Sequence, residues 1–146
     1  MDNIEIEKIW IDSDFFEVNI LFISKNVSCN IKFYMQDNII LQLKSQIEKF
    51  VDNPYSSKIL WEIRGEDSKG VLIESKGVDS CGHVALRIKV KAMMQYDKFA
   101  YDEDTLDDYN CCFTVETELG LLLEFGKKLR EICDGDVSTK ISLLNL

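Results

Sequence analysis

A strict alternation of apolar and polar residues constrains this chain more than any other feature of its sequence. Residues that alternate with a period of two point to opposite faces of a β-strand, so such a run predicts a strand with one buried and one solvated face. The longest run places these residues on one face: Val84, Leu86, Ile88, Val90 and Ala92. The opposite face carries a cationic row, Arg87, Lys89 and Lys91. Because a strand over residues 84–94 would be long, we expect it to twist strongly or to contain a bulge.

Shorter runs of the same period predict further strands, joined mostly by short turns. They cover residues 4–11, 16–23, 27–34, 59–64, 71–76 and 110–116. Lys25-Asn26 is a tight hairpin turn between two of them. The first run, residues 4–11, is the least regular, and Trp10 lies near its end. Strands in this order predict an antiparallel meander.

The period changes to that of an α-helix in two places. The first predicted helix covers residues 37–52, with Asp37 or Asn38 as its N-cap and Pro54 after its end. The second covers residues 117–133, with Thr117 as its cap. Gly120 and Gly126 weaken this helix, a cost that is explained if they let it approach the sheet closely.

These elements predict one α+β domain over residues 1–146. We expect a single antiparallel, meander-like β-sheet of six or seven strands. Both helices, over residues 37–52 and 117–133, would lie on one face, and the other face would meet solvent. The apolar tail over residues 137–146 would dock on this body.

Composition excludes several classes of protein. No apolar run approaches the roughly 20 residues that a membrane span needs, and the first residues resemble no signal peptide, so we expect a cytoplasmic protein without membrane contact. The five cysteines have no framework spacing, and the chain holds one histidine. We interpret the cysteines as small buried hydrophobic residues and predict no metal site and no cofactor.

Negative charge is concentrated in two segments. Residues 1–17 hold six acids and one lysine, and residues 97–108 also hold six acids and one lysine, so each segment carries −5 of the net charge of −9. The remaining residues hold 14 acids and 15 bases, which sum to +1. A concentrated negative patch attracts basic partners and repels nucleic acids and membrane surfaces. Nucleic-acid binding is therefore the function that the charge most disfavours.

Residues that could carry out chemistry are few. Cys81 and His83 would share a strand face, which allows a thiolate–imidazole pair, but we see no orienting Asn or Asp and no oxyanion feature beside them. The carboxylates of residues 102–107 could bind Ca²⁺, although they lack the glycine and the twelfth-position glutamate of an EF-hand. We therefore predict that the chain is not an enzyme. A small-ligand or divalent-metal-binding module remains the alternative.

The acidic segment near residue 100 is the predicted partner-binding site. Aromatic residues interleave with its carboxylates, and anchoring aromatics among steering charges are typical of protein interfaces. The predicted contact residues are Tyr96, Asp97, Phe99, Tyr101, Asp102, Glu103, Asp104, Asp107, Asp108 and Tyr109. An ordinary solvated loop is the alternative interpretation.

Three parts of the sequence resemble a group of small bacterial proteins that includes immunity proteins of wall-associated polymorphic toxins, of the contact-dependent growth inhibition type. One part is Trp61 with Gly65 downstream. The second is Gly82-His83-Val84, which leads into Leu86, Ile88 and Val90. The third is the segment FTVETELGLLLEFGKKL, residues 113–129, in which the matching residues are Leu119, Gly120, Leu123 and Leu129.

The resemblance implies a cytoplasmic inhibitor that binds the C-terminal domain of a toxin and blocks it without doing chemistry. Such toxins are often nucleases, whose phosphate-binding sites are basic. The acidic segments of this chain are complementary to a basic surface of that kind. The resemblance does not cover the first third of the chain or the acidic segment at residues 97–108, so it does not identify the partner.

Overall fold

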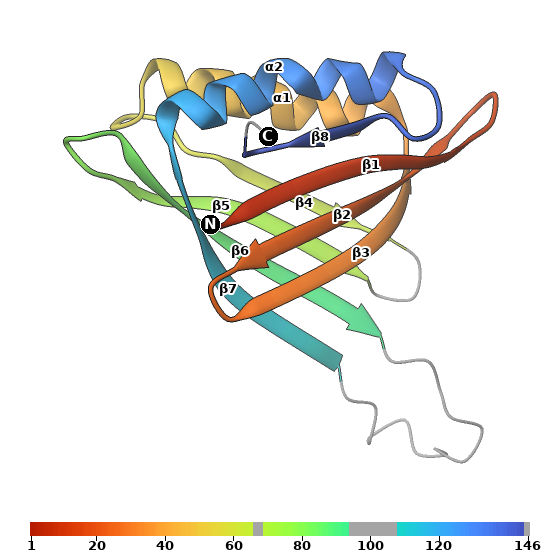
Figure 1. The fold of residues 1–146 in the computed structure, drawn as a ribbon, viewed down its shortest axis with the longest axis horizontal. Coiled ribbons are helices and arrows are strands. Elements are labelled where there is room, and N and C mark those ends of the chain that lie inside the picture. The colour runs from red at the N-terminus through yellow and green to blue at the C-terminus, as the bar shows by residue number, and fades with distance from the viewer. Residues whose placement is uncertain (66–68, 94–107, 145–146) are drawn as a thin grey trace.

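A computed structural model describes residues 1–65, 69–93 and 108–144 of this protein (Figure 1). Within them the chain forms eight strands and two helices and is an α+β protein. The elements in chain order are β1 (Asn3–Ile11), β2 (Phe16–Ser24), β3 (Val27–Met35), α1 (Asp37–Asp52), β4 (Leu60–Arg64), β5 (Gly70–Val78), β6 (His83–Met93), β7 (Asp108–Glu118), α2 (Leu119–Asp134) and β8 (Lys140–Ser142).

The strands form two antiparallel sheets of four, so the prediction of a single sheet is wrong. The first sheet has the order β3-β2-β1-β8 and the second has the order β4-β5-β6-β7. The alternating pattern specified correctly most of the side chains that are buried, for example Val84, Leu86, Ile88 and Val90, but it carries no information on whether β3 pairs with β4. Helix α1 intervenes between these two strands, and the chain begins a new sheet after it.

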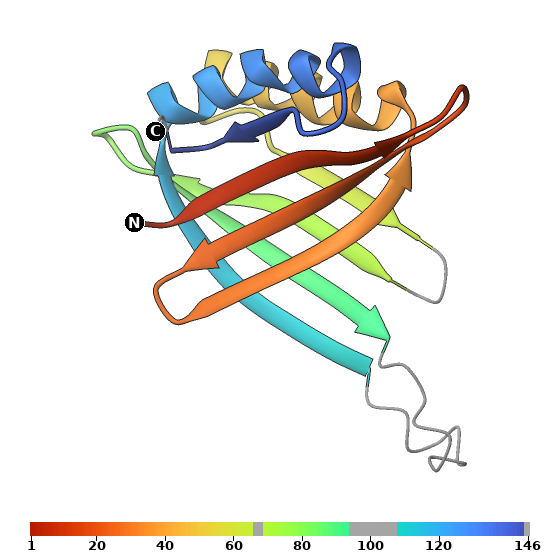
Figure 2. The ribbon, with the colours of Figure 1, turned by 45° about the vertical axis from the view of Figure 1, so that its right-hand side comes forward.

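The buried faces of the two sheets face each other, and α1 and α2 lie side by side across one end of the space between them (Figures 1 and 2). The core is one continuous cluster of apolar side chains drawn from both sheets and both helices. Phe22 and Phe113 meet edge to face across the sheets, with ring centroids 5.9 Å apart. Each sheet therefore buries its apolar face against the other sheet as well as against the helices.

Side-chain hydrogen bonds join the edges of the two sheets. At the β7 edge, the Ser24 hydroxyl donates to the Thr114 carbonyl at 2.8 Å, and the Glu116 N–H donates to the Asp2 carboxylate at 2.9 Å. At the β3 edge, the Lys69 ammonium donates to the Lys32 carbonyl at 3.0 Å. These bonds satisfy edge groups that would otherwise be open to another strand.

Both helices are confirmed, but their predicted caps are wrong. The N-cap residues are Gln36 and Glu118, and neither makes a side-chain capping bond. Thr117 instead is a buried residue of β7, because the alternation of β7 continues to its end at Glu118, next to the start of α2. A Cβ at Gly126 would lie 2.9 Å from Ile47, so this glycine permits close contact between α2 and α1, not with the sheet. Gly120 has open space around it and permits no such approach.

The two sheets share one plan. Taken from β8, the first sheet has the order β8-β1-β2-β3 and is followed by α1; the second has the order β4-β5-β6-β7 and is followed by α2. Each helix has 16 residues. The sequence shows no repeat that would predict this correspondence, because two faces with the same burial pattern can be built from different residues.

The C-terminal tail docks as predicted, as strand β8 beside β1. Ile141 and Leu143 are buried in the core. Neither α1 nor α2, the helices of the described residues, is long and apolar enough to cross a membrane.

Candidate protein-binding surface

Most of the predicted contact residues lie outside the part of the chain that the structure describes. These are Tyr96, Asp97, Phe99, Tyr101, Asp102, Glu103, Asp104 and Asp107. The other two, Asp108 and Tyr109, form the start of strand β7, where a loop was predicted. Asp108 pairs with Met93 at the end of β6, so the described strands on either side of the segment end at the same point.

The second acidic segment, residues 1–17, is fully described, and its one base is not on the surface. Lys8 is 1% exposed. Its ammonium donates to the carbonyl oxygens of Gly135 at 2.8 Å and Cys133 at 3.3 Å, at the C-terminal end of α2, where a helix favours positive charge. The ammonium also lies 4.6 Å from the centre of the Phe16 ring. Every charged side chain that this segment leaves at the surface is therefore an acid.

Three of these acids lie at or next to the tip of the β1–β2 hairpin. Asp12 and Asp14 form the tip and are exposed, and Glu17 lies on β2 and is partly exposed. The hairpin projects beyond the rest of the body (Figures 1 and 2). Within the described residues, the carboxylates of Asp14 and Glu17 make no hydrogen bond or ion pair. They are free to contact a partner.

The turn of this hairpin is held by Asp12. Its carboxylate accepts hydrogen bonds from the backbone N–H groups of Phe15 at 2.7 Å and Asp14 at 2.8 Å, and its own N–H donates to the Phe15 carbonyl at 2.9 Å. These N–H donors, that of Phe15 first, lower the pKa of Asp12 below its ordinary value. The tip is thus kept in one conformation with an ionised carboxylate.

Large apolar side chains are exposed on the same hairpin and beside it. Trp10 is 43% exposed, Phe15 47% and Tyr34, on the neighbouring β3, 62%. Trp10 and Tyr34 meet edge to face with ring centroids 5.7 Å apart. Glu17 is the register partner of both residues and stands on β2, the strand between theirs, so the two rings meet across its position on the outer face of the sheet.

A β-bulge explains why Trp10 faces outward. Along β1, Ile4, Ile6 and Lys8 point into the core, and a continued alternation would bury Trp10 as well. The register shifts between Lys8 and Trp10, which reverses the facing of the next residue. This bulge explains why the alternation of residues 4–11 is irregular in the sequence.

We name as the hairpin surface the exposed group formed by Trp10, Asp12, Asp14, Phe15, Glu17 and Tyr34. Sequence reasoning identified the charge of this segment but not the aromatic residues beside it. The feature of the sequence that could have revealed them is the irregular alternation of residues 4–11, near whose end Trp10 lies.

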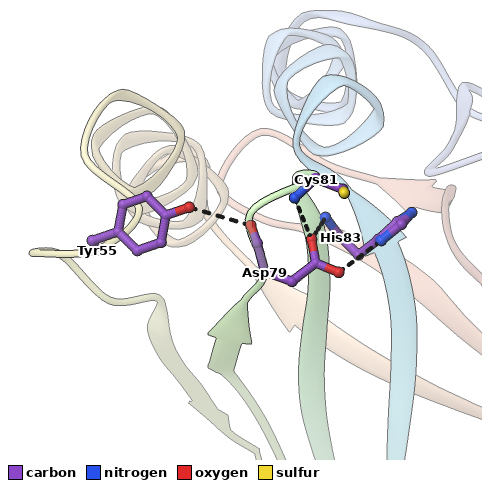
Figure 3. Close-up of polar contacts among 4 residues, drawn as sticks. All are labelled: Tyr55, Asp79, Cys81 and His83. Carbon is purple, nitrogen blue, oxygen red and sulfur yellow. Dashed lines mark hydrogen bonds and ion pairs between the residues drawn. The ribbon is translucent and has the colours of Figure 1, made fainter.

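Cys81 and His83, the other candidate pair, lie at the turn between β5 and β6 (Figure 3). The Asp79 carboxylate accepts from the backbone N–H groups of Cys81 and His83, both at 2.9 Å, and contacts the His83 imidazole Nδ1 at 2.8 Å. The Tyr55 hydroxyl donates to the Asp79 carbonyl at 3.2 Å. The prediction that no acid orients His83 is therefore wrong: Asp79 was overlooked because it belongs to the turn and not to the strand.

The environment of this turn favours a charged ion pair. The hydrogen bond that the His83 imidazole makes to the Asp79 carboxylate, the charge of Asp79, and the charges of Glu118 and Glu116 raise the pKa of His83. The backbone and side-chain hydrogen bonds that His83 donates to Asp79 lower the pKa of Asp79. Among the described residues no hydrogen bond joins the Cys81 thiol to His83. The imidazole thus pairs with a carboxylate and not with a thiol, so the arrangement stabilises a turn without activating a nucleophile.

The cysteines are more exposed than predicted. Cys81 and Cys112 are exposed because one lies in a turn and the other on the outer face of β7. Burial raises the pKa of Cys133 to about 11 and also raises that of Cys29. In residues 1–65, 69–93 and 108–144, no group of three or more His, Cys, Asp or Glu side chains could hold a metal ion. Residues 102–107, for which we considered Ca²⁺ binding, all lie outside the described residues.

One hollow of about 690 Å³ lies beside this turn. Its walls include Gly77, Ala85, His83, Glu116 and Thr117. The Thr117 hydroxyl is buried and has no hydrogen-bond partner among the described residues.

Comparison of the chain with protein-family models, curated proteins and solved structures gives no match.

Proposed function

We propose that this chain is an immunity protein that binds and neutralises the C-terminal toxin domain of a secreted or cell-surface bacterial toxin, inside the cytoplasm and without chemistry. The burial of Lys8 is the observation that supports this most. It leaves the N-terminal segment with an acidic surface, next to exposed aromatic side chains. The resemblance of residues 61–74, 82–90 and 113–129 to immunity proteins points to the same class.

A nuclease is the toxin that fits this surface best. Nuclease active sites are basic because they bind phosphates, and a surface with unpaired carboxylates is complementary to them. Complementary charge accelerates association and makes it sensitive to salt. The same charge disfavours a role in which this chain itself binds nucleic acid.

A binding experiment with an identified partner tests the proposal. The genes next to this one are first searched for a large secreted protein with a variable C-terminal domain, and the probe is that domain, inactivated in its active site. We expect a stable complex by calorimetry, with an affinity that falls as NaCl rises from ~50 mM to ~500 mM. Co-expression of this chain should also protect cells from the active domain. Absence of both binding and protection would contradict the proposed function.

A small-ligand or divalent-metal-binding module is the second candidate, and the unpaired Thr117 hydroxyl beside the 690 Å³ hollow favours it. Buried polar groups normally have a partner, so a ligand could supply the missing one. A rise in melting temperature on addition of Ca²⁺ or Mn²⁺, or of a ligand that enters the hollow, would support this function. An unchanged melting temperature, together with toxin binding, would contradict it.

A further inference from the structure

We propose that the toxin domain docks on the hairpin surface and is recognised there through arginine side chains. This inference rests on the proposed function and assigns its partner-binding site to residues of β1, β2 and β3. The acidic segment at residues 97–108 is the competing location.

The aromatic side chains of the hairpin surface are exposed without a role in the core. Of the eight large hydrophobic residues that are exposed in the described ranges, four lie on or beside this hairpin: Trp10, Ile11, Phe15 and Tyr34. A bulge turns Trp10 outward, at the position where the alternation would have buried it. Bulges that re-aim a side chain are common next to functional sites, and grouped exposed aromatics are typical of interfaces.

The surface is organised before a partner arrives. The edge-to-face contact of Trp10 with Tyr34 and the hydrogen bonds of Asp12 to the turn fix the side chains and the backbone that would make the contact. Less conformational entropy is then lost on binding.

The placement of Glu17 beside two aromatic rings that contact each other matches arginine. A guanidinium can pair with a carboxylate through two parallel hydrogen bonds while its flat face stacks on an indole or phenol ring. Glu17 is opposite Trp10 on one side and Tyr34 on the other. A lysine ammonium would find the same charge but would lose the paired hydrogen bonds.

The negative charge of the hairpin surface favours binding of a basic protein over binding of other partners. Asp12, Asp14 and Glu17 supply the negative potential, and Lys8 cannot offset it at the surface because it is buried against α2. Lys32 is an exposed base on the same face, two residues from Tyr34, and limits the acidic area on that side. A second copy of this chain, or a nucleic acid, would bring like charge to the hairpin and be repelled.

Charge reversal with a matched control tests the inference. The variant D14K/E17K changes two carboxylates that have no internal partner, so the turn held by Asp12 stays intact. The control D52K/E131K makes the same change in net charge at exposed positions in the last turns of α1 and α2. A third variant reverses Asp102, Asp104, Asp107 and Asp108. All three are measured against the inactivated toxin domain, with thermal unfolding as a check on folding.

We expect D14K/E17K to weaken binding by about 100-fold at low salt and the control to change it by about threefold or less. W10A should weaken binding by about tenfold or more. Near wild-type affinity of both D14K/E17K and W10A, with the loop reversal abolishing binding, would overturn the inference and leave the proposed function standing. If the wild-type chain does not bind, the proposed function fails and the inference fails with it.

Tryptophan fluorescence gives a readout at the surface itself. The chain has two tryptophans; Trp61 is 2% exposed, whereas Trp10 is 43% exposed. Binding at the hairpin surface should protect the emission from the collisional quencher acrylamide, and this protection should vanish in W10F. Equal quenching of the free and bound wild-type protein would contradict docking at this surface.

Discussion

The hairpins β1–β2 and β5–β6 occupy the same place in the two sheets and are built in the same way. Each first strand has a bulge near its end, between Lys8 and Trp10 in β1 and between Ser75 and Gly77 in β5. Four residues after Lys8 and after Ser75 stands an aspartate whose carboxylate accepts two backbone N–H groups of the turn. The bulge and the turn belong to the shared plan.

What differs is the set of side chains that the shared plan presents. Where the first sheet exposes Trp10, the second has Gly77. The aspartate of the second turn is also bound to His83, so its charge is paired within the chain, whereas Asp14 and Glu17 in the first hairpin have no partner among the described residues. In the second hairpin the turn carboxylate is bound internally, and in the first two carboxylates are open to a partner. This difference supports the proposal that the binding residues are those that the scaffold does not need.

The largest expected difference between the two hairpins lies at the residue before each bulge. Lys8 holds the chain that leads into β8 by backbone bonds to Ser138 and Thr139 and caps α2 with its side chain. Ser75 holds the chain that leads into β4, through Ile59, whose N–H donates to the Ser75 hydroxyl at 2.9 Å. K8M should lower the free energy of unfolding by about 2–4 kcal/mol, because two buried carbonyls lose a charged donor. S75A should lower it by about 1 kcal/mol.

Urea unfolding of the two variants measures this difference. Methionine keeps most of the length of the lysine, so lost packing contributes little. Equal effects of K8M and S75A would mean that the ammonium is not required to hold α2 and β8. That result would also mean that the fold does not require Lys8 to be buried, and the burial of Lys8 is what leaves only acids among the exposed charges of the N-terminal segment.

The comparison also shows where sequence reasoning succeeds and where it stops. The alternation of residues 84–90 and most of the apolar stripe of each helix predicted burial correctly, because each is a local consequence of strand or helix geometry. In α2 the stripe omitted Phe125, which is buried, and included Leu119 and Leu123, which are only partly buried. The division into two sheets depends on which strand pairs with β3, a long-range choice that no local pattern encodes. The hairpin surface was missed for a related reason: a single bulge moved Trp10 to the face opposite to the one its spacing indicated.

A smaller effect is expected from the ion pair in the second hairpin, and it should depend on pH. The raised pKa of His83 means that its contribution to stability is fully present below pH 6.5 and is lost as the pH rises through the raised value. The lowered pKa of Asp79 means that its contribution is present above pH 3.8 and is lost as the pH falls through the lowered value. Between these limits both groups are charged. The effect is modest because both side chains are exposed and screened.

NMR titration of His83, the sole histidine, tests this assignment. D79N should move the pKa of His83 down toward its ordinary value of 6.5. In the first hairpin, D12N should weaken the turn equally across the neutral range, because no histidine faces Asp12. An unchanged pKa of His83 in D79N would show that Asp79 orients the backbone alone.

The smallest effect on stability is expected at the residues that we assign to binding. W10A and Y34A should each lower the free energy of unfolding by about 1 kcal/mol or less, since both side chains are exposed and lose mainly their mutual edge-to-face contact. W61A should cost about 3–5 kcal/mol, because Trp61 fills the core and its indole N–H donates to the Ile39 carbonyl at 3.0 Å. Thermal or urea unfolding separates the two classes. If W10A were as destabilising as W61A, Trp10 would be a core residue and its exposure would carry no functional meaning. A small loss of stability combined with a large loss of toxin binding would instead mean that the bulge in β1 exposes an indole that contributes little to folding and much to binding of the partner.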